Sequence, residues 1–216
     1  VPVGDIASQD IMRGEESETL GIMKLMNLRG PILVVLPGSH TKLIAVDEKN
    51  RIAASVSTIA GELGSAVASS TLLGRSLGES GYLECIDEEM AMAGFDASRR
   101  HGLGRALYMI RLLDLMSDTT ADQRRNFLWG SLVGADVAAL EADSRLSSIV
   151  RVEVNTVNVV IGGSDPLRTL FETLFAYWAQ SLPGVKITVL PTEVVEKASA
   201  IGATLVALAK EGLIDR

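Results

Sequence analysis

Residues 32–57 have the sequence ILVVLPGSHTKLIAVDEKNRIAASVS, and this stretch decides the fold. It contains three apolar runs of strand length, and polar turns of a few residues separate them. Connections this short join neighbouring strands as antiparallel hairpins. The stretch therefore predicts three consecutive antiparallel strands, at 32–36, 43–46 and 51–57.

The remaining sequence is mostly helical, with two further strands near its end. Residues 1–9 are predicted to be irregular, and a helix is predicted over about 15–27. A second helix is predicted over 61–73, with Thr58 as its N-cap, and a helical insertion over about 80–145. Strands and helices then alternate, with strands at 157–161 and 185–190 and helices at 167–181 and 193–211.

This order of elements predicts an α/β fold with a mixed sheet and flanking helices. It resembles one lobe of the actin-like ATPase superfamily, and ribonuclease-H-like folds share the same order of elements. A fold of this kind carries many functions, so the function must be argued from particular residues.

Composition excludes several classes of function. Hydrophobic residues make up 47% of the 216 residues and charged residues 22%, which is enough apolar sequence for a large core. The net charge is −7 and no basic stripe offsets it, so neither nucleic acid nor an anionic membrane is an expected partner. A single cysteine, Cys85, excludes an internal disulfide framework and favours a reducing, cytoplasmic location.

The turn between the first two strands has the composition of an anion-binding loop. Gly38 permits close approach to the backbone, Ser39 and Thr41 carry hydroxyls, and Lys42 adds a positive charge. These features are typical of a loop that holds a nucleotide phosphate. An ordinary polar hairpin turn explains the same residues, and the sequence alone leaves both interpretations open.

Two glycine-containing junctions mark further candidate ligand positions. Gly162, Gly163 and Ser164 follow a predicted strand, where a glycine pair lets a flat ligand lie against the backbone. Gly61 and Glu62 open the helix after the third strand. A tight turn explains the first junction equally well, and a favourable first-turn charge explains Glu62.

Residues 10–16, DIMRGEE, concentrate charged side chains around one glycine. Asp10 could accept a proton from a substrate hydroxyl, and Arg13 could bind a substrate carboxylate through two hydrogen bonds. The alternative is an acidic helix start with ordinary capping. His40, His101 and Cys85 do not follow the spacing of a metal site, so no protein-bound metal is expected.

Four segments together resemble the 2-dehydro-3-deoxygalactonokinase family. The family's D-V-M-R-G-E-E-T-Q-like segment is similar to residues 10–18, DIMRGEESE, and its P-G-T-H-x-K-W loop to residues 37–43, PGSHTKL. Its T-G-E-L is similar to residues 60–63, AGEL, and its F-L-x-G-L-L-I-G-x-E-V to residues 127–137, FLWGSLVGADV. The order and spacing of these segments agree along the chain.

The resemblance implies an ATP-dependent kinase that phosphorylates the 6-hydroxyl of a 2-keto-3-deoxy sugar acid, with ATP and Mg²⁺ as cofactors. It implies that Asp10 is the base, that Arg13 holds the substrate carboxylate and that Glu15 or Glu16 orients Arg13. Residues 1–28 would lie on the substrate side of a cleft, and residues 29–216 would form the nucleotide-binding lobe. The implied nucleotide contacts are Gly38, Ser39, His40, Thr41, Lys42, Gly61, Glu62, Gly162, Gly163 and Ser164.

Departures from the family pattern leave alternatives open. Leu43 stands where the family has Trp, and Ala60 stands where it has Thr. The family's first lobe, whose D-x-G-[ST] loop organises Mg²⁺, has no counterpart here, so we expect the chain to be part of a longer protein. A non-catalytic nucleotide-binding lobe and a kinase for another small sugar or acid remain alternative functions. A homodimer is a possible assembly.

Overall fold

The computed structural model describes residues 2–78, 80–151 and 156–213. The ends of the two predicted domain ranges, Val1 and 214–216, lie outside the described residues, as do 79 and 152–155. Between these limits the chain folds around one five-stranded sheet. None of the helices in the described ranges has the length and apolar composition needed to cross a membrane.

The sheet has the strand order β3-β2-β1-β4-β5. β1 pairs antiparallel with β2, and β2 with β3, as the short turns predict. β1, β4 and β5 run parallel, because a long helical connection joins β1–β3 to β4 and a helix joins β4 to β5. This order confirms the predicted ribonuclease-H-like lobe. The strands are β1 Ile32–Leu36, β2 Thr41–Val46, β3 Ile52–Thr58, β4 Val157–Ile161 and β5 Val185–Val189.

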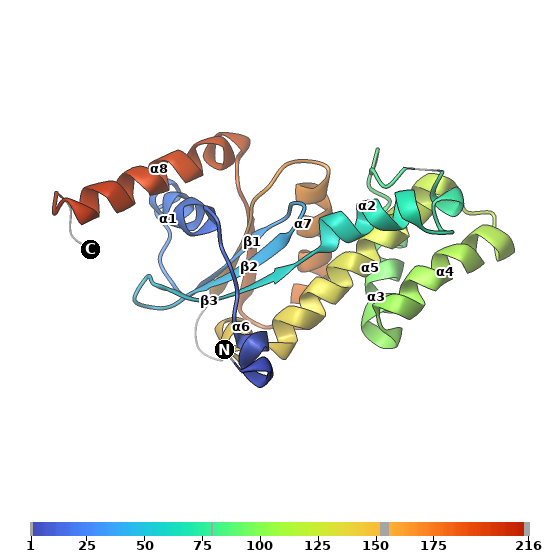
Figure 1. Cartoon of the computed structure of the whole chain (residues 1–216), viewed down its shortest axis with the longest axis horizontal. Coiled ribbons are helices and arrows are strands. Elements are labelled where there is room, and N and C mark those ends of the chain that lie inside the picture. The colour runs from blue at the N-terminus through green and yellow to red at the C-terminus, as the bar shows by residue number, and fades with distance from the viewer. Residues whose placement is uncertain (1, 79, 152–155, 214–216) are drawn as a thin grey trace.

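Two helices from opposite ends of the chain cover one face of the sheet. α1, Glu15–Leu25, lies directly beside α8, Thr192–Lys210, as Figure 1 shows. A Cβ atom at Gly21 would overlap the carbonyl of Ala198, and one at Gly202 would overlap the carbonyl of Ser17. Glycine therefore allows the two backbones to touch, and this contact fixes α1, which begins at Glu15, five residues after Asp10.

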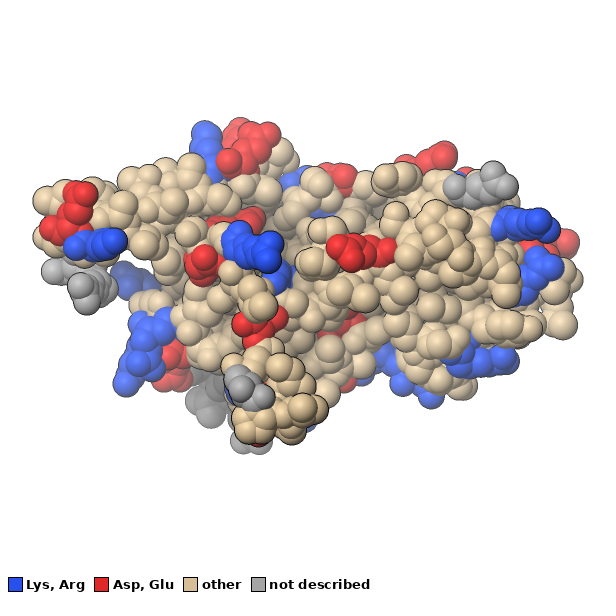
Figure 2. All heavy atoms as spheres, viewed as in Figure 1, with Lys and Arg blue, Asp and Glu red and all other residues tan. Residues whose placement is uncertain are grey.

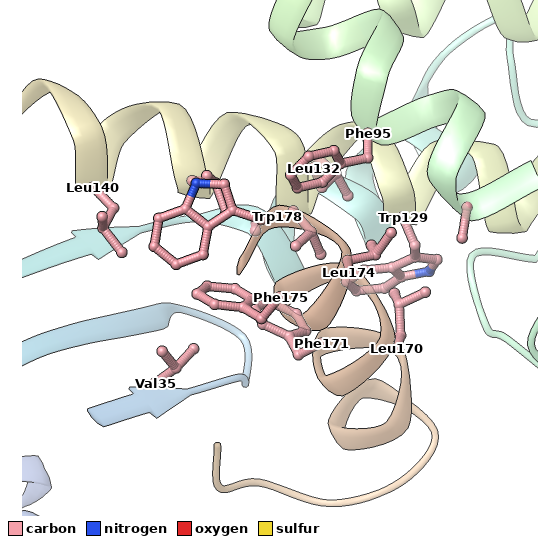
Figure 3. Close-up of a cluster of buried hydrophobic side chains, with 14 of the residues drawn as sticks. Val35, Phe95, Trp129, Leu132, Leu140, Leu170, Phe171, Leu174, Phe175 and Trp178 are labelled. Atoms are coloured by element: carbon pink, nitrogen blue, oxygen red, sulfur yellow. The ribbon is translucent and has the colours of Figure 1, made fainter. Parts of the chain in front are cut away.

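The remaining helices lie on the other face of the sheet and extend beyond it. α5 and α7 pack on the strands, while α3 and α4 pack on α5 (Figure 1). Phe171, Phe175 and Trp178 of α7 fill the space between the sheet and α5, as Figure 3 shows. The helices on this side are α2 Ala60–Ser70, α3 Glu88–His101, α4 Leu103–Met116, α5 Ala121–Ala142, α6 Ser144–Val150 and α7 Leu167–Ala179, with a short 3-10 helix, η2, at Arg75–Leu77.

Two local predictions differ from the structure. The N-terminal segment is not irregular, because Val3–Ser8 form a 3-10 helix, η1. The prediction that Thr58 caps the following helix is wrong. Thr58 is the last residue of β3, and α2 begins after Ile59 with no side-chain cap. β3 continues further than its apolar pattern indicates, because Thr58 pairs with Thr41 across the hairpin.

Candidate functional site

Three backbone segments meet at the ends of β1 and β4. The turn after β1 contacts the start of α2, where a Cβ atom at Gly61 would overlap the carbonyl of Gly38. The amide of Glu62 donates a hydrogen bond to the carbonyl of Ser39 at 3.0 Å. Gly163 has a φ of +80°, and a Cβ atom there would lie 3.0 Å from the carbonyl oxygen of Pro37. Gly61 and Gly163 are therefore needed where the three segments pack closely against one another.

A pocket of about 470 Å³ opens at this junction, and we call it the glycine-lined pocket. It brings together five residues predicted to contact a nucleotide, namely Gly38, Ser39, Gly61, Glu62 and Ser164. Sequence reasoning missed its opposite wall, which residues 81–83 and Trp129 form. The indole N–H of Trp129 donates to the carbonyl of Gly81 at 2.7 Å and fixes that wall. Trp129 lies in the family-like motif at 127–137, and this position was the one feature of the sequence that could have indicated it as a site residue.

A second pocket, of about 530 Å³, lies beside the turn on the side of the N-terminal segment, and we call it the Asp10 pocket. Residues 9–15 form one wall, and residues of β2 and β3 form the other. The predicted residues that line it are Asp10, Arg13, Glu15, His40 and Lys42. The structure thus brings the charged N-terminal motif next to the turn, although about 30 residues separate them in sequence.

Asp10 is held as a carboxylate. The hydroxyl of Ser55 donates to its Oδ2 at 2.6 Å. Burial alone would raise the pKa of Asp10, but hydrogen bonds from Ser55, Ser57 and the Ile11 amide, together with the charge of Lys42, hold that pKa below its ordinary value. A carboxylate kept ionised in a pocket can accept a proton from a hydroxyl group.

Lys42 points toward Asp10 and away from the glycine-lined pocket. Its side chain is 7% exposed, and its amine donates to the Ile11 carbonyl and to the Ser57 hydroxyl, the latter at 2.6 Å. Glu15 Oε1 lies 4.0 Å from the same nitrogen. The direction follows from strand geometry, because Lys42 shares a face of β2 with Ile44, and Ile44 packs in the core under α1 and α8.

Glu15 and Glu16 bind backbone amides at the start of α1. Glu15 Oε2 accepts from the Arg13 amide at 2.6 Å, and Glu16 Oε2 accepts from the Gly14 amide at 2.8 Å. Gly14 has a φ of +117°, which glycine adopts without strain. The two carboxylates therefore fix the turn that carries Arg13, and the exposed Arg13 side chain lies at the rim of the Asp10 pocket.

A narrow pocket of about 220 Å³ shares residues with both larger ones. Gly38 and Ser39 also line the glycine-lined pocket, while Glu15, His40 and Lys42 also line the Asp10 pocket. Glu18, Leu36, Pro37 and Gly163 complete its wall. Burial, and then the neighbouring charge of Glu15, raise the pKa of Glu18. Such a pair of carboxylates favours a cation.

The remaining predicted residues lie around this arrangement. His40 Nε2 is 3.0 Å from Glu62 Oε1, so an exposed ion pair or hydrogen bond links the turn to α2. The Gly162 amide donates to the Val35 carbonyl at 2.9 Å and ties β4 to β1. Thr41 differs from the others, because its buried side chain lies on the α5 side of the sheet beside Asp136. Within the described residues, no group of three or more potential metal ligands occurs.

Figure 2 shows the face on which the N-terminal segment crosses toward α1. Basic and acidic side chains lie close together there, and no patch of a single sign covers this face. This mixture agrees with the contacts in the Asp10 pocket, where Lys42 lies among Asp10, Glu15 and Ser57. A small polar ligand matches such a surface better than an extended polyanion does.

Comparison with known proteins identifies the family of the chain. This chain is 27% identical over 165 residues to a protein of Rhizobium meliloti (strain 1021) described as a 2-dehydro-3-deoxygalactonokinase. The matched residues cover 76% of this chain and 50% of that protein. A crystal structure assigned to a 2-dehydro-3-deoxygalactonokinase of Sinorhizobium meliloti has a TM-score of 0.72 and 25% identity, over 93% of this chain and 61% of that one. The chain thus spans about half the length of the curated relative it matches. The family model described as 2-keto-3-deoxy-galactonokinase matches residues 3–191, most of the chain, and the chain belongs to that family.

Proposed function

We propose that this chain carries the nucleotide site and part of the acceptor site of an ATP-dependent sugar-acid kinase. The reaction would transfer the γ-phosphate of ATP to the 6-hydroxyl of 2-dehydro-3-deoxy-galactonate or a related 2-keto-3-deoxy sugar acid. One observation carries the proposal. A glycine-lined pocket and a pocket with an ionised carboxylate open on either side of one turn, and a narrow pocket shares residues with both.

The glycine-lined pocket fits a nucleotide. Its volume of about 470 Å³ lies within the usual range for small-molecule sites, and its walls combine glycine backbone with the apolar face of Trp129. Gly38 and Ser39 would lie along the phosphates. Ser164, the residue of the turn 162–164 that lines this pocket, would lie nearer the adenosine. In this proposal His40 and Glu62 close the edge of the pocket, since they already bind each other.

The Asp10 pocket fits a small acid that carries a hydroxyl. Arg13 would bind the substrate carboxylate at the rim, because a guanidinium group matches the geometry of a carboxylate. Glu15 and Glu16 would keep Arg13 in place through the backbone amides that they accept from. Residues 1–28 would thereby form the acceptor side of the site and residues 29–216 the nucleotide side.

Asp10 would accept the proton of the attacking hydroxyl. In phosphoryl transfer the protein contributes mainly positioning and charge stabilisation, so a fixed carboxylate at the acceptor oxygen is the expected residue. The hydrogen bonds from Ser55 and Ser57 keep Asp10 ionised and fix the orientation of its carboxylate. The positive charge of Lys42 would offset the negative charge of the reacting groups.

The narrow pocket is not a complete Mg²⁺ site, because Glu15 already binds the Arg13 amide and lies 4.0 Å from the Lys42 amine. Mg²⁺ would therefore be held mainly by the phosphate oxygens of ATP, with Glu18 as the carboxylate of this pocket that could reach it. The ion would neutralise charge on the transferred phosphoryl group. A non-catalytic lobe is the less favoured alternative, because it gives no role to the pocket that Asp10, Arg13 and Lys42 line.

The test is a coupled ADP-release assay on the full-length protein, with ATP, Mg²⁺ and a panel of 2-keto-3-deoxy sugar acids. We expect ADP release that depends on one sugar acid. Asp10→Asn should lower kcat by about 100-fold or more, because proton acceptance is lost, while the KM for ATP stays within about twofold.

Asp5→Asn is the matched control, since Asp5 is an exposed carboxylate of the same segment that lines none of the three pockets. It should leave kcat unchanged. ADP release that no sugar acid stimulates, from a folded protein that binds ATP, would contradict the proposed function. An unchanged kcat in Asp10→Asn would remove Asp10 from the mechanism.

A further inference from the structure

The 3-10 helix that precedes Asp10 is not held in place by burial. Each residue of η1, from Val3 to Ser8, is exposed, including the apolar side chains of Val3 and Ile6, which are 88% and 60% exposed. Without buried apolar area, a short segment gains little free energy from the hydrophobic effect. Its position must therefore depend on polar contacts.

Most of those polar contacts lie inside the segment itself. The Gln9 amide donates to the Ile6 carbonyl at 3.0 Å, and the Ser8 hydroxyl donates to the Asp5 carbonyl at 2.8 Å. Such bonds shape the turn but do not attach it to the sheet. Among the hydrogen bonds between described residues, one reaches η1 from a distant element. Arg145 Nη1 donates to the Ser8 carbonyl at 2.7 Å.

Arg145 is itself fixed before it reaches that carbonyl. It lies in the first turn of α6, and Figure 1 shows α6 next to the N-terminal coil. Asp143, the N-cap of α6, accepts from Arg145 Nε at 3.1 Å and from Nη2 at 2.5 Å. Asp143 also accepts from the Arg145 amide at 2.8 Å. The guanidinium group is thus oriented by a forked ion pair, which lowers the entropy lost on binding Ser8.

Lys42 makes the corresponding contact on the other side of Asp10. Its amine donates to the carbonyl of Ile11, one residue after Asp10, while Arg145 binds the carbonyl two residues before it. Two cationic side chains from different parts of the fold therefore hold the backbone on both sides of the carboxylate. The hydrogen bond with Asp143 and the charge of Asp143 raise the pKa of Arg145, and the charge of Asp10 adds to this effect.

We propose that Arg145 is a positioning residue for the proposed reaction and that, with Lys42, it clamps the backbone that carries Asp10. The inference rests on the proposed function, because Asp10 is the group being positioned. It assigns a role to the end of the helical insertion, which is to set the geometry of the acceptor site. Arg145 lies 135 positions from Asp10, so no local sequence pattern connects the two residues.

The first measurement is amide hydrogen exchange of the segment 3–11 in the full-length protein without substrates. Arg145→Gln should raise exchange in this segment about tenfold, because the contact that attaches η1 is lost. Arg145→Lys keeps the charge and should give a smaller rise. Arg51→Gln is the matched control, since Arg51 makes the same forked pair with Asp47 in the β2–β3 turn, at 3.0 and 2.8 Å.

The second measurement separates positioning from general stability. In steady-state assays Arg145→Gln should lower kcat about tenfold or more and leave the KM for ATP within about twofold, because a displaced base slows the chemical step. Arg145→Lys should restore part of kcat. Loss of global stability alone would lower the amount of active enzyme but would leave kcat per folded enzyme unchanged.

Each outcome decides the proposal. Unchanged exchange in Arg145→Gln would overturn the clamp, and faster exchange with an unchanged kcat would overturn its role in positioning Asp10. If the wild-type protein shows no sugar-acid kinase activity, the proposed function fails, yet the exchange measurement still decides whether Arg145 holds the segment. Faster exchange with a lower kcat and partial rescue by lysine supports the full inference.

Discussion

Lys42 shows how the fold gives a single residue contacts that its sequence neighbours do not predict. The resemblance to sugar kinases implied that Lys42 binds nucleotide phosphates, and that role stays a prediction. The structure places its amine 2.6 Å from the Ser57 hydroxyl and on the Ile11 carbonyl. A charge in this position acts directly on the ionisation of Asp10.

This placement makes a prediction about pH dependence. The proton-accepting form of Asp10 is the carboxylate. Hydrogen bonds from Ser55, Ser57 and the Ile11 amide lower the pKa of Asp10 most, and the charge of Lys42 adds a smaller effect in the same direction. Lys42→Met removes that charge and keeps the length of the side chain. The pKa of Asp10 should then rise, so the acid limb of the kcat/KM profile should move to higher pH.

The measurement is a pH series of ADP release by the full-length enzyme, alongside ATP binding by titration calorimetry. Lys49→Met is the control, because Lys49 lies in the β2–β3 turn, remote from the three pockets. If Lys42 acts only through Asp10, ATP affinity should stay within about twofold in both variants. A large loss of ATP affinity with an unmoved acid limb would instead support direct phosphate binding by Lys42.

Sequence reasoning at this scale could name residues but not their partners. Asp10, Arg13 and Glu15 were predicted from one charged motif, and all three line the same pocket. Arg145 and Trp129 were not predicted as site residues, because they reach the site from the helical insertion through tertiary packing. Thr41 was expected at a nucleotide, but strand alternation turns it to the opposite face from Lys42.

At the scale of elements, glycines decide how closely the helices pack. α5 contains Gly130 and Gly134 one turn apart, and both face α3. A Cβ atom at Gly130 would overlap the carbonyl of Ala91, and one at Gly94 of α3 would overlap the carbonyl of Phe127. The glycines of the motif at 127–137 therefore serve helix packing, while Trp129 of the same motif lines a pocket.

Gly130→Ala should destabilise the protein by about 1–3 kcal/mol or more, because the α3 backbone has to move to admit the methyl group. Gly104→Ala is the matched control. A Cβ atom at Gly104, in α4, meets nothing within 4 Å, so alanine should stabilise by up to about 1 kcal/mol through helix propensity. Urea denaturation measures both changes, and equal midpoints for the two variants would contradict this account of the α3–α5 contact.

The elements themselves were largely predictable from sequence. Apolar runs and short polar turns predicted all five strands, and periodicity predicted α1, α7 and α8 to within a few residues. Two predictions failed for physical reasons. η1 has no apolar pattern because it buries nothing, and Thr58 remains in β3 because cross-strand pairing with Thr41 extends the hairpin.

At the scale of the whole molecule, the sheet brings distant segments together. β1 and β4 are parallel neighbours, so the turns that follow them lie at the same edge, although more than 100 residues separate them in sequence. The close contact of Gly163 with Pro37 follows from this pairing. The sequence could predict each turn from its glycines, but only the strand order shows that the turns form one pocket.

The same packing buries a carboxyl group whose ionisation affects the stability of the whole fold. Asp136 of α5 is 2% exposed and lies beside the Thr58 and Thr41 hydroxyls. Among the described residues, neither Asp136 Oδ2 nor Thr58 Oγ1 has a partner with hydrogen-bond geometry. Burial raises the pKa of Asp136 to about 6, while the two hydroxyls act in the opposite direction.

The sign of the effect follows from proton binding. Between the unfolded pKa of 3.8 and the folded pKa of about 6, the folded state binds more protons than the unfolded state. The contribution of the Asp136 carboxyl group to the free energy of unfolding is therefore fully present well below pH 4, and it is lost as the pH rises through about 6. The difference between the two pKa values corresponds to about 3 kcal/mol.

Asp136→Asn should remove this dependence, because an amide of the same size does not titrate. We expect the free energy of unfolding of the wild type to fall by about 2 kcal/mol more than that of the variant between pH 4 and pH 7, which is most of the full effect. Urea denaturation at several pH values measures the difference, with the exposed Asp118→Asn as control. Parallel curves for wild type and Asp136→Asn would show that Asp136 has an ordinary pKa, and that water or a small movement of the strand ends satisfies this carboxylate in solution.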